Sequence, residues 1–435
     1  MLLFKNKFFK ATFILVLSGM STKLLGLLIK IIYMRILPRE SIGLYSLVMP
    51  TYSLLLNIAT FSITTTISKL IAENEDLRIM NSASVIILVI NLGIVAVMFV
   101  LNPFIAKYLL HIKETVYLLN ACVLTLPFAS LACILKGYYY GKQKMGPHAI
   151  SNTVEQLIRL CLIIFVLPLF IKKSYIHGAV FLICTSLLTE FSSIITFIIC
   201  MNKDDLIKIK KVYYNKDDYN KIMNLSLPLL STKIINNIAY FFEPIVLTNV
   251  LLKKGYLNSF IVTEYGAYNA YAIATLAIPS FFITAIDSSL LPELIKEKNN
   301  QFVFKKRCKQ ALIITLVIGL TSSLIITIFR DYILMFLYHN TSGSYYIKIL
   351  GPFFTLFYFE GLLSTILQAK GYLKSILLIT IISSISKVLF TIALCFIFNG
   401  LNGLIYSEII NIMIVIVLSS YIILKKKKIN YVKFN

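Results

Sequence analysis

The chain has 435 residues, of which 58% are hydrophobic and 14% are charged, and its mean hydropathy is +0.83. A soluble protein of this length could not bury so much apolar surface, so the composition excludes a soluble enzyme and predicts an integral membrane protein. The net charge of +23 would suggest a nucleic-acid partner in a soluble chain. Here it follows the charge bias of membrane-protein loops, so we expect no nucleic acid as partner.

The chain begins with a charged and then apolar segment that resembles a signal peptide. This segment lacks a small-x-small cleavage site and continues as one long apolar stretch, so we expect an uncleaved first helix. Further apolar windows of about 20 residues, bounded by charge, Gly or Pro, follow along the chain. They predict an all-α polytopic membrane protein with about twelve transmembrane helices, at residues 9–34, 42–70, 83–106, 116–136, 148–170, 176–200, 222–250, 264–292, 308–329, 346–369, 375–398 and 402–424.

Lys and Arg residues are unevenly distributed over the loops between these spans. With the N-terminus inside, the inner segments carry more than twice as many of them as the outer loops. The positive-inside rule therefore predicts a multi-pass protein of the cytoplasmic membrane with both termini in the cytoplasm. The basic tail at residues 425–435 is expected to contact anionic lipid of the inner leaflet.

The two halves of the chain resemble each other. Four short stretches recur in the same order: STKLLG (21–26) as STKIIN (231–236), IGLYSL (42–47) as YGAYNA (265–270), SKLIAEN (68–74) as PELIKEK (292–298), and LKGY (135–138) as AKGY (369–372). Because each half has an even number of spans, we expect two pseudo-symmetric lobes related by an axis along the membrane normal. The predicted domains are an N-terminal six-helix lobe (1–200), a cytoplasmic linker (201–221), a C-terminal six-helix lobe (222–424) and the basic tail.

Five cations fall inside predicted spans, away from the residues at the span ends, and four of them occupy matching positions in the two halves. Lys23 matches Lys233, Arg159 matches Lys387, and Lys30 shares a helix face with Lys23 about two turns away. A cation at the bilayer centre costs about 2.5–3.5 kcal/mol, so we expect these side chains to face the bundle interior. A cavity with such cations suits a phosphate group. The predicted headgroup-binding residues are therefore Lys23, Lys30, Arg159, Lys233 and Lys387.

Embedded acids offer an alternative explanation of these cations. Glu155 precedes Arg159 by one helical turn, which favours a local ion pair, so neutralisation of Arg159 is an equal alternative to a cavity role. No acid lies so close in sequence to Lys23, Lys233 or Lys387. These three lysines either line a cavity or pair with acids of other helices, and Lys30 either lines the cavity or extends to the outer surface. The candidates for pairing or for a coupling-ion site are Glu155, Glu190, Glu243, Asp287, Glu360 and Glu408.

The residue types of common catalytic and metal sites form no legible motif. The seven cysteines lie in or beside apolar segments without a CxxC pair, and the four histidines lie near predicted span ends without an HExxH motif. We therefore predict no catalytic residues, no metal, no cofactor and no enzymatic activity.

The segment STKLLGLLIKIIYMRILPRESIGLYSLVMPTYSLLLNIATFSITTTISKLIAE (21–73) closely resembles the opening of the stage V sporulation protein B family. The resemblance continues through LKGYYYGKQKMGPHAISNTVEQLIRL (135–160) and LGPFFTLFYFEGLLSTILQAKGYL (350–373). The members of that family are polysaccharide-biosynthesis membrane proteins of the multidrug/oligosaccharidyl-lipid/polysaccharide exporter superfamily. Lys23 and Lys30 stand where that family has arginines, and a lysine attracts pyrophosphate without the bidentate fork of arginine.

The resemblance implies a two-lobed flippase that moves an undecaprenyl-pyrophosphate-linked saccharide or peptidoglycan precursor across the membrane by alternating access. It also implies a role in spore cortex or cell-wall synthesis, with a lipid-linked anionic saccharide, membrane lipids and cell-wall synthesis enzymes as partners. The alternative on the same fold is an ion-coupled exporter of cationic drugs, which predicts an acid-dominated cavity. A membrane-bound enzyme and a non-transporting scaffold are weaker hypotheses, because the outer loops are short and no histidine is central in a span.

Overall fold

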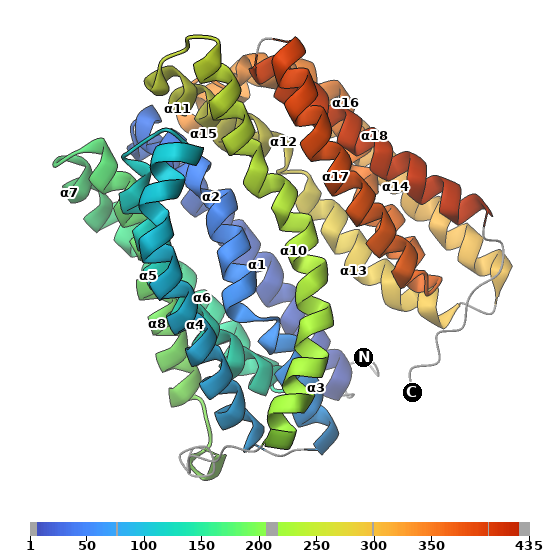
Figure 1. Cartoon of the computed structure of the whole chain (residues 1–435). Helices are drawn as coiled ribbons and strands as arrows, with labels where there is room; N and C mark the ends of the chain where they lie inside the picture. Colours follow the sequence, from blue (N-terminus) through green and yellow to red (C-terminus); the bar gives the residue numbers. More distant parts are fainter. Residues whose placement is uncertain (1–6, 75–76, 206–215, 298–299, 399, 426–435) are drawn as a thin grey trace. The chain divides into compact units, whose positions relative to one another are not determined.

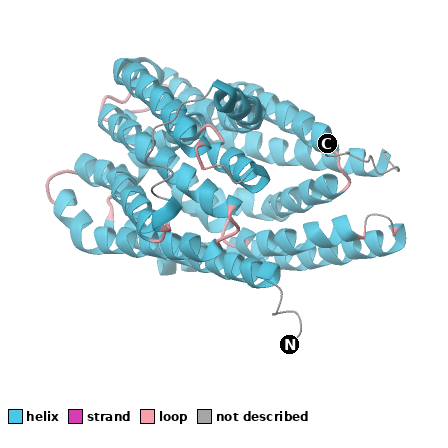
Figure 2. Cartoon of the chain, turned by 90° about the horizontal axis from the view of Figure 1, so that it is seen from below, coloured by secondary structure: helices cyan, strands magenta, loops and turns pink. Residues whose placement is uncertain are grey.

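The computed structural model describes residues 7–74, 77–205, 216–297, 300–398 and 400–425. Throughout these residues the regular structure is helical, as Figure 2 shows. This agrees with the all-α class predicted from hydropathy. Two segments predicted from the sequence fall largely on other residues: most of the linker (201–221) and nearly all of the basic tail (425–435) lie outside the described residues.

The chain divides into two units, Met1–Asn237 and Ile238–Asn435. The helices of the first unit are α1 (Lys7–Ile36), α2 (Arg39–Thr60), α3 (Ile63–Asn74), α4 (Ile79–Phe104), α5 (Thr115–Gly141), α6 (Met145–Cys161), α7 (Leu167–Ile171), α8 (Tyr175–Ile199) and the first part of α10 (Lys216–Lys253). The second unit continues α10 and adds α11 (Asn258–Gly266), α12 (Ala274–Leu276), α13 (Ser280–Lys296), α14 (Gln301–Ile328), α15 (Arg330–Tyr338), α16 (Ser344–Ala369), α17 (Leu373–Ile397) and α18 (Leu401–Lys425). Short π-helical turns follow α4, α6 and α11, at Ile105–Leu109, Leu162–Val166 and Ala267–Ile273.

The long helices account for the predicted membrane spans. Within the described residues, ten helical segments are long and apolar enough to cross a membrane, and an eleventh consists of α11–α12 and α13, bent by 51°. The 30-residue helix α1 occupies the first predicted span. Two predicted spans contain breaks: α2 ends at Thr60 and is followed by Phe61, whose φ of 49° is left-handed, and the break between α12 and α13 contains Pro279. The chain is a multi-pass membrane protein.

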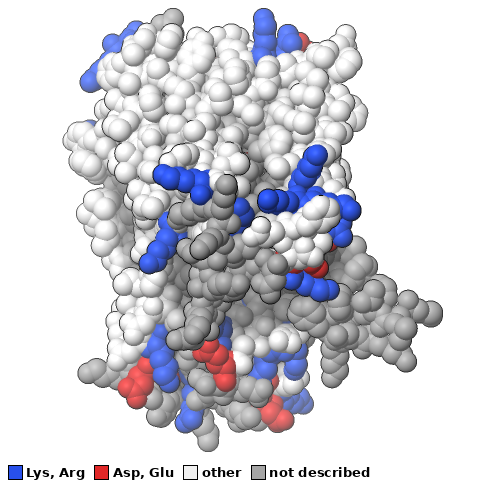
Figure 3. Space-filling view, turned by 90° about the vertical axis from the view of Figure 1, so that its right-hand side faces the viewer, with Lys and Arg blue, Asp and Glu red and all other residues white. Residues whose placement is uncertain are grey.

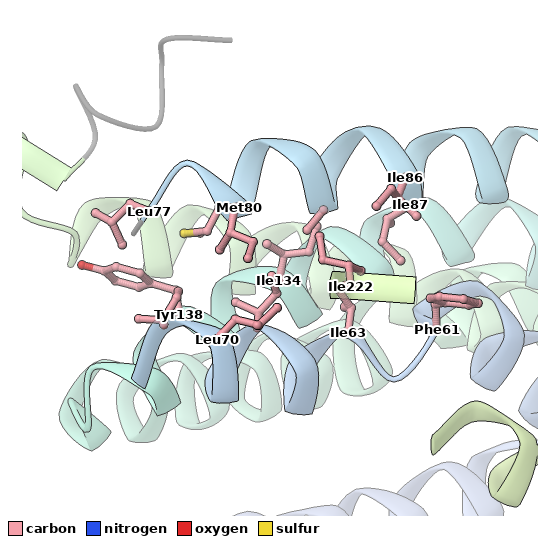
Figure 4. Packing of buried hydrophobic residues seen from close by; sticks show 14 of the residues in the cluster. Phe61, Ile63, Leu70, Leu77, Met80, Ile86, Ile87, Ile134, Tyr138 and Ile222 are labelled. Atoms are coloured by element: carbon pink, nitrogen blue, oxygen red, sulfur yellow. The ribbon is translucent and has the colours of Figure 1, made fainter. Parts of the chain in front are cut away.

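Helix α5 is central to the first unit, where it packs against α2, α3, α4 and α8 (Figure 1). A Cβ added at Gly137 would lie 2.8 Å from the Thr64 carbonyl oxygen, and one at Gly141 would lie 2.8 Å from the Ile71 Cβ. These two glycines, one turn apart, therefore let α3 approach α5 closely. Figure 4 shows the apolar cluster at this contact, with Ile63 of α3, Met80 and Ile87 of α4, Ile134 of α5 and Ile222 of α10 labelled.

The cluster in Figure 4 explains where the two units divide. Ile222 and Leu230 of α10 belong to the core of the first unit, and Thr66 of α3 shares a 2.8 Å hydrogen bond with Ser226 of α10. The division consequently falls inside α10, after Asn237. The sequence places the boundary earlier, at the polar loop 201–221, because polarity marks where the chain leaves the membrane and carries no information about which unit the following helix packs against.

Helix α16 has the corresponding place in the second unit, where it packs against α13, α14 and α18, while α17 packs mainly on α18 (Figure 1). Outward apolar side chains are abundant on these helices: Val317 of α14 is 55% exposed and Leu389 of α17 is 61% exposed. The face in Figure 3 has a broad area with few charged side chains and bands of Lys and Arg. Such a surface is expected where lipid replaces water.

Candidate functional site

The cation predicted in the eleventh span forms an ion triad in the second unit. Lys387 of α17 is 3% exposed, and its Nζ lies 2.9 Å from Glu243 Oε2 of α10 and 2.7 Å from Glu408 Oε2 of α18. The triad therefore links the consecutive helices α17 and α18 to α10, which is far from them in sequence. Of the two alternatives for Lys387, pairing between helices is the one that the structure shows. Its role in headgroup binding stays a prediction, because that role requires the triad to open.

A second layer of polar and aromatic groups holds the triad. The Lys387 ammonium lies 3.9 Å from the centre of the Tyr240 ring, a cation–π contact. On the other side, the Tyr265 hydroxyl donates to Glu243 Oε1 at 3.2 Å, and the Asn269 amide donates to the Tyr265 hydroxyl at 3.2 Å. Asn269 lies in the π-helical turn of the eighth span and Tyr265 lies two residues before that turn, at the end of α11. Such local irregularities are frequent at functional sites.

Acid outnumbers base at the triad, and two further acids of the second unit, Glu360 and Asp287, are partly buried. Two carboxylates face one ammonium, and Glu360 of α16 is near enough to interact electrostatically with Lys387 and Glu408. Glu360 Oε1 has no hydrogen-bond partner among the described residues. The same holds for Oδ1 of Asp287, on α13. This surplus of acid differs from the positive interior that the sequence predicts for these spans.

The matching cation of the first unit is neutralised locally. Arg159 of α6 places its Nη2 3.2 Å from Glu155 Oε1 and donates to Thr189 Oγ1 of α8 at 3.0 Å. The ion pair between neighbouring turns is the one that the sequence predicts as an alternative to a cavity role. Glu190, the remaining acid of the set, pairs at 3.9 Å with Lys136 of α5.

Lys136 is the functional candidate that sequence reasoning missed. It is the last residue of the predicted span 116–136 and therefore counts as a charge at the span end, yet α5 continues to Gly141 and the side chain is only 20% exposed. The recurrence of LKGY (135–138) as AKGY (369–372) is a signal that marks this position. With Glu155, Arg159 and Glu190, Lys136 forms a charge group with equal numbers of cations and carboxylates.

The remaining predicted cations lie in the first unit. Lys23 of α1 and Lys233 of α10 are exposed, and Lys30 of α1 is partly buried. The structure does not bring Lys387 into their unit, so the five predicted cations do not form one cluster within either unit. In the described residues no group of three or more His, Cys, Asp or Glu side chains is arranged to hold a metal ion.

This arrangement of two helical units, each with charged groups buried among spans, defines a multi-pass membrane protein with the exporter-superfamily fold. An inward-facing multidrug resistance MATE family transporter of the MOP superfamily has a TM-score of 0.69 at 16% identity, covering 92% of this chain and 93% of that chain. The lipid II flippase MurJ in an inward closed conformation also has a TM-score of 0.69, at 15% identity, covering 94% of this chain and 87% of that chain.

The pattern of the family described as "Polysaccharide biosynthesis protein" matches residues 8–298, and the chain belongs to this family. It is 29% identical over 398 residues to stage V sporulation protein B of Bacillus subtilis (strain 168), covering 88% of this chain and 77% of the relative. It is also 25% identical over 183 residues to the lipid II flippase MurJ of the same organism, covering 38% of this chain and 34% of the relative. The family resemblance stated from the sequence is thereby confirmed.

Proposed function

We propose that the protein is a flippase for an undecaprenyl-pyrophosphate-linked saccharide or peptidoglycan precursor. Family membership and similarity to the curated relatives support the substrate class. One observation assigns this function to particular residues: Lys23 and Lys233 are exposed, and they occupy repeat-equivalent positions in predicted spans. Of the three other embedded cations, Arg159 and Lys387 form ion pairs with carboxylates at 3.2 Å or less.

In this proposal the pyrophosphate is held by Lys23 of α1 and Lys233 of α10. Lys30, on the same face of α1 as Lys23, assists them. Ammonium groups compensate phosphate charge effectively where the local dielectric constant is low. The two units rock relative to each other to expose the bound headgroup alternately to the two sides. Arg159 and Lys387 keep their units rigid through the pairs they form, and they contact the headgroup only in states in which those pairs open.

The proposed cycle takes place in the cytoplasmic membrane with both termini in the cytoplasm, as the loop charges indicate. It needs no bound cofactor. The membrane potential or an ion gradient supplies the drive, and the surplus acid near Lys387 offers a place for a coupling ion. Delivery of the precursor to cell-wall synthesis enzymes during sporulation is part of the proposal, on the strength of the name of the relative stage V sporulation protein B.

The test is binding measured by native mass spectrometry on the purified full-length protein. The ligands are a lipid-linked pyrophosphate disaccharide and an organic cation. Loss of both ammonium groups in Lys23→Ala/Lys233→Ala is expected to weaken binding of the pyrophosphate lipid at least about tenfold, because each charge-assisted hydrogen bond contributes on the order of 1.5–3 kcal/mol. The control Lys172→Ala/Lys173→Ala removes the same charge from exposed positions beyond α7 and is expected to bind normally.

The same experiment distinguishes the drug exporter. The acid surplus in the second unit is the observation that favours it. Tight binding of the organic cation, together with pyrophosphate-lipid binding that is unaffected by the loss of Lys23 and Lys233, would replace the flippase with the cation exporter.

A further inference from the structure

A pocket of about 540 Å³ opens in the second unit between α14, α16 and α18. Its volume is within the range of about 300–1,000 Å³ that is typical of small-molecule sites. Three lysines line it: Lys305 and Lys309 near the start of α14, and Lys370 directly after α16. The remaining wall is mainly apolar and includes Leu312, Leu363 and Ile366.

The three ammonium groups have no carboxylate partner within the described part of the chain. Arg307, on the same turns of α14, lies 2.7 Å from Glu293 of α13, while none of the described acids forms an ion pair with the lysines of the pocket. Lys370 Nζ instead donates to the carbonyl oxygen of Ile423 on α18 at 3.2 Å. Burial lowers the pKa of Lys370 below its ordinary value, and the like charge of Lys305 lowers it further. The pocket thus concentrates positive charge that a bound anion would stabilise.

The repeat-equivalent position in the first unit provides an internal comparison. Lys136 corresponds to Lys370 through the LKGY and AKGY stretches, and it has a carboxylate partner, Glu190. In the first unit a carboxylate of the same unit therefore neutralises the charge of Lys136. In the second unit the corresponding Lys370 lies beside two further lysines. This difference indicates that the counter-charge of the second unit comes from a ligand.

The position of the pocket indicates which kind of anion it binds. It lies at the ends of three apolar spans, and Leu312, Ile423 and Leu424 of those spans form part of its wall. Leu424 is 75% exposed. An amphiphile fits this combination better than a free anion does, because its headgroup meets the lysines while its chains lie along the apolar helices.

We propose that the pocket lined by Lys305, Lys309 and Lys370 is a binding site for an anionic glycerophospholipid of the surrounding membrane. The phosphate of the headgroup accepts from the three ammonium groups, and one acyl chain lies along the wall formed by Leu312, Leu363 and Ile366. The lysines of the pocket differ from those proposed to hold the headgroup of the transported lipid, which lie on α1 and α10. By the loop charges the pocket faces the inner leaflet, where basic pockets between spans bind acidic headgroups.

The test is native mass spectrometry of the full-length protein in neutral detergent, titrated with phosphatidylglycerol or with phosphatidylcholine of the same chains. Wild-type protein is expected to bind one phosphatidylglycerol much more tightly than phosphatidylcholine. The variant Lys305→Gln/Lys309→Gln/Lys370→Gln is expected to bind it about 100-fold more weakly, given the attraction of each lysine to acidic lipid. The variant with arginine at all three positions keeps the charge and is expected to bind as wild type does.

A matched control removes the same charge elsewhere on the side that is predicted to be cytoplasmic. Lys144→Gln/Lys203→Gln/Lys221→Gln changes three exposed lysines of the first unit, and it is expected to leave the tight phosphatidylglycerol site intact. Equal loss in this control would show general attraction to a basic protein and would overturn the proposal.

Two competitors test whether the occupant is a membrane phospholipid. Displacement of phosphatidylglycerol by equimolar glycerol phosphate would identify a site for a free anion. Displacement by an equimolar lipid-linked pyrophosphate saccharide, again dependent on Lys305, Lys309 and Lys370, would place the pocket on the route of the transported lipid. Either result overturns the proposal, while resistance to both supports it.

Discussion

The two units hold their buried cations in different ways. In the first, Arg159 pairs with a carboxylate one turn away on its own helix, and the side chain remains 27% exposed. In the second, Lys387 occupies the equivalent span but pairs with carboxylates from two other helices and is 3% exposed. A pair within one helix stabilises mainly that helix, whereas the triad requires α10, α17 and α18 to be in place together. We therefore expect the second unit to depend much more on its cation.

The largest effect is expected for Lys387→Ala. Removing the ammonium leaves Glu243 and Glu408 buried beside each other without a counter-charge, and breaking a buried pair in this way costs about 3–5 kcal/mol. The measurement is the unfolding free energy of purified protein in detergent. The neutral triple variant Lys387→Met/Glu243→Gln/Glu408→Gln is expected to recover most of the loss, because it removes all three charges together. Wild-type stability of Lys387→Ala would mean that the two carboxylates are already neutral in the folded protein.

The contrast between these cations shows what the sequence predicts and what it does not. Hydropathy predicts the helices, because each membrane span must form its backbone hydrogen bonds within itself. The spacing of Glu155 and Arg159 predicts their ion pair, because residues one helical turn apart are neighbours. The partners of Lys387 come from two other helices, the next one in the chain and the distant α10, and which carboxylates meet the lysine depends on how those helices pack. The phosphate-binding role proposed for Lys23 and Lys233 remains a prediction, since it depends on a ligand.

The next largest effect concerns a glycine that the two halves share in sequence but use differently. Gly137 lies inside α5, where an added Cβ meets the Thr64 carbonyl oxygen at 2.8 Å. Its counterpart Gly371 follows the end of α16 with a φ of 78°. We expect Gly137→Ala to destabilise by about 1–3 kcal/mol through overpacking, and Gly371→Ala by about 1–2 kcal/mol through left-handed strain.

Asparagine at the same positions separates crowding from strain. It is tolerated in the left-handed region, so Gly371→Asn is expected to be nearly neutral, whereas Gly137→Asn is expected to be at least as damaging as Gly137→Ala. Thermal unfolding of the four variants in one detergent gives the comparison. If asparagine is equally harmful at both sites, crowding also limits Gly371, and the two halves use this glycine alike.

The smallest effect is expected for Arg159→Ala in the first unit. It removes the 3.2 Å contact with Glu155 and the 3.0 Å hydrogen bond to Thr189, but the partly exposed pair is screened, so we expect a loss of about 1 kcal/mol. Glu155 is left beside Lys136 and Glu190, whose opposite charges limit the cost. Arg159→Lys keeps the charge and is expected to retain most of the stability. A loss from Arg159→Ala as large as that from Lys387→Ala would show that the four-charge group, like the triad, holds several helices together and that the contrast between the two units is wrong.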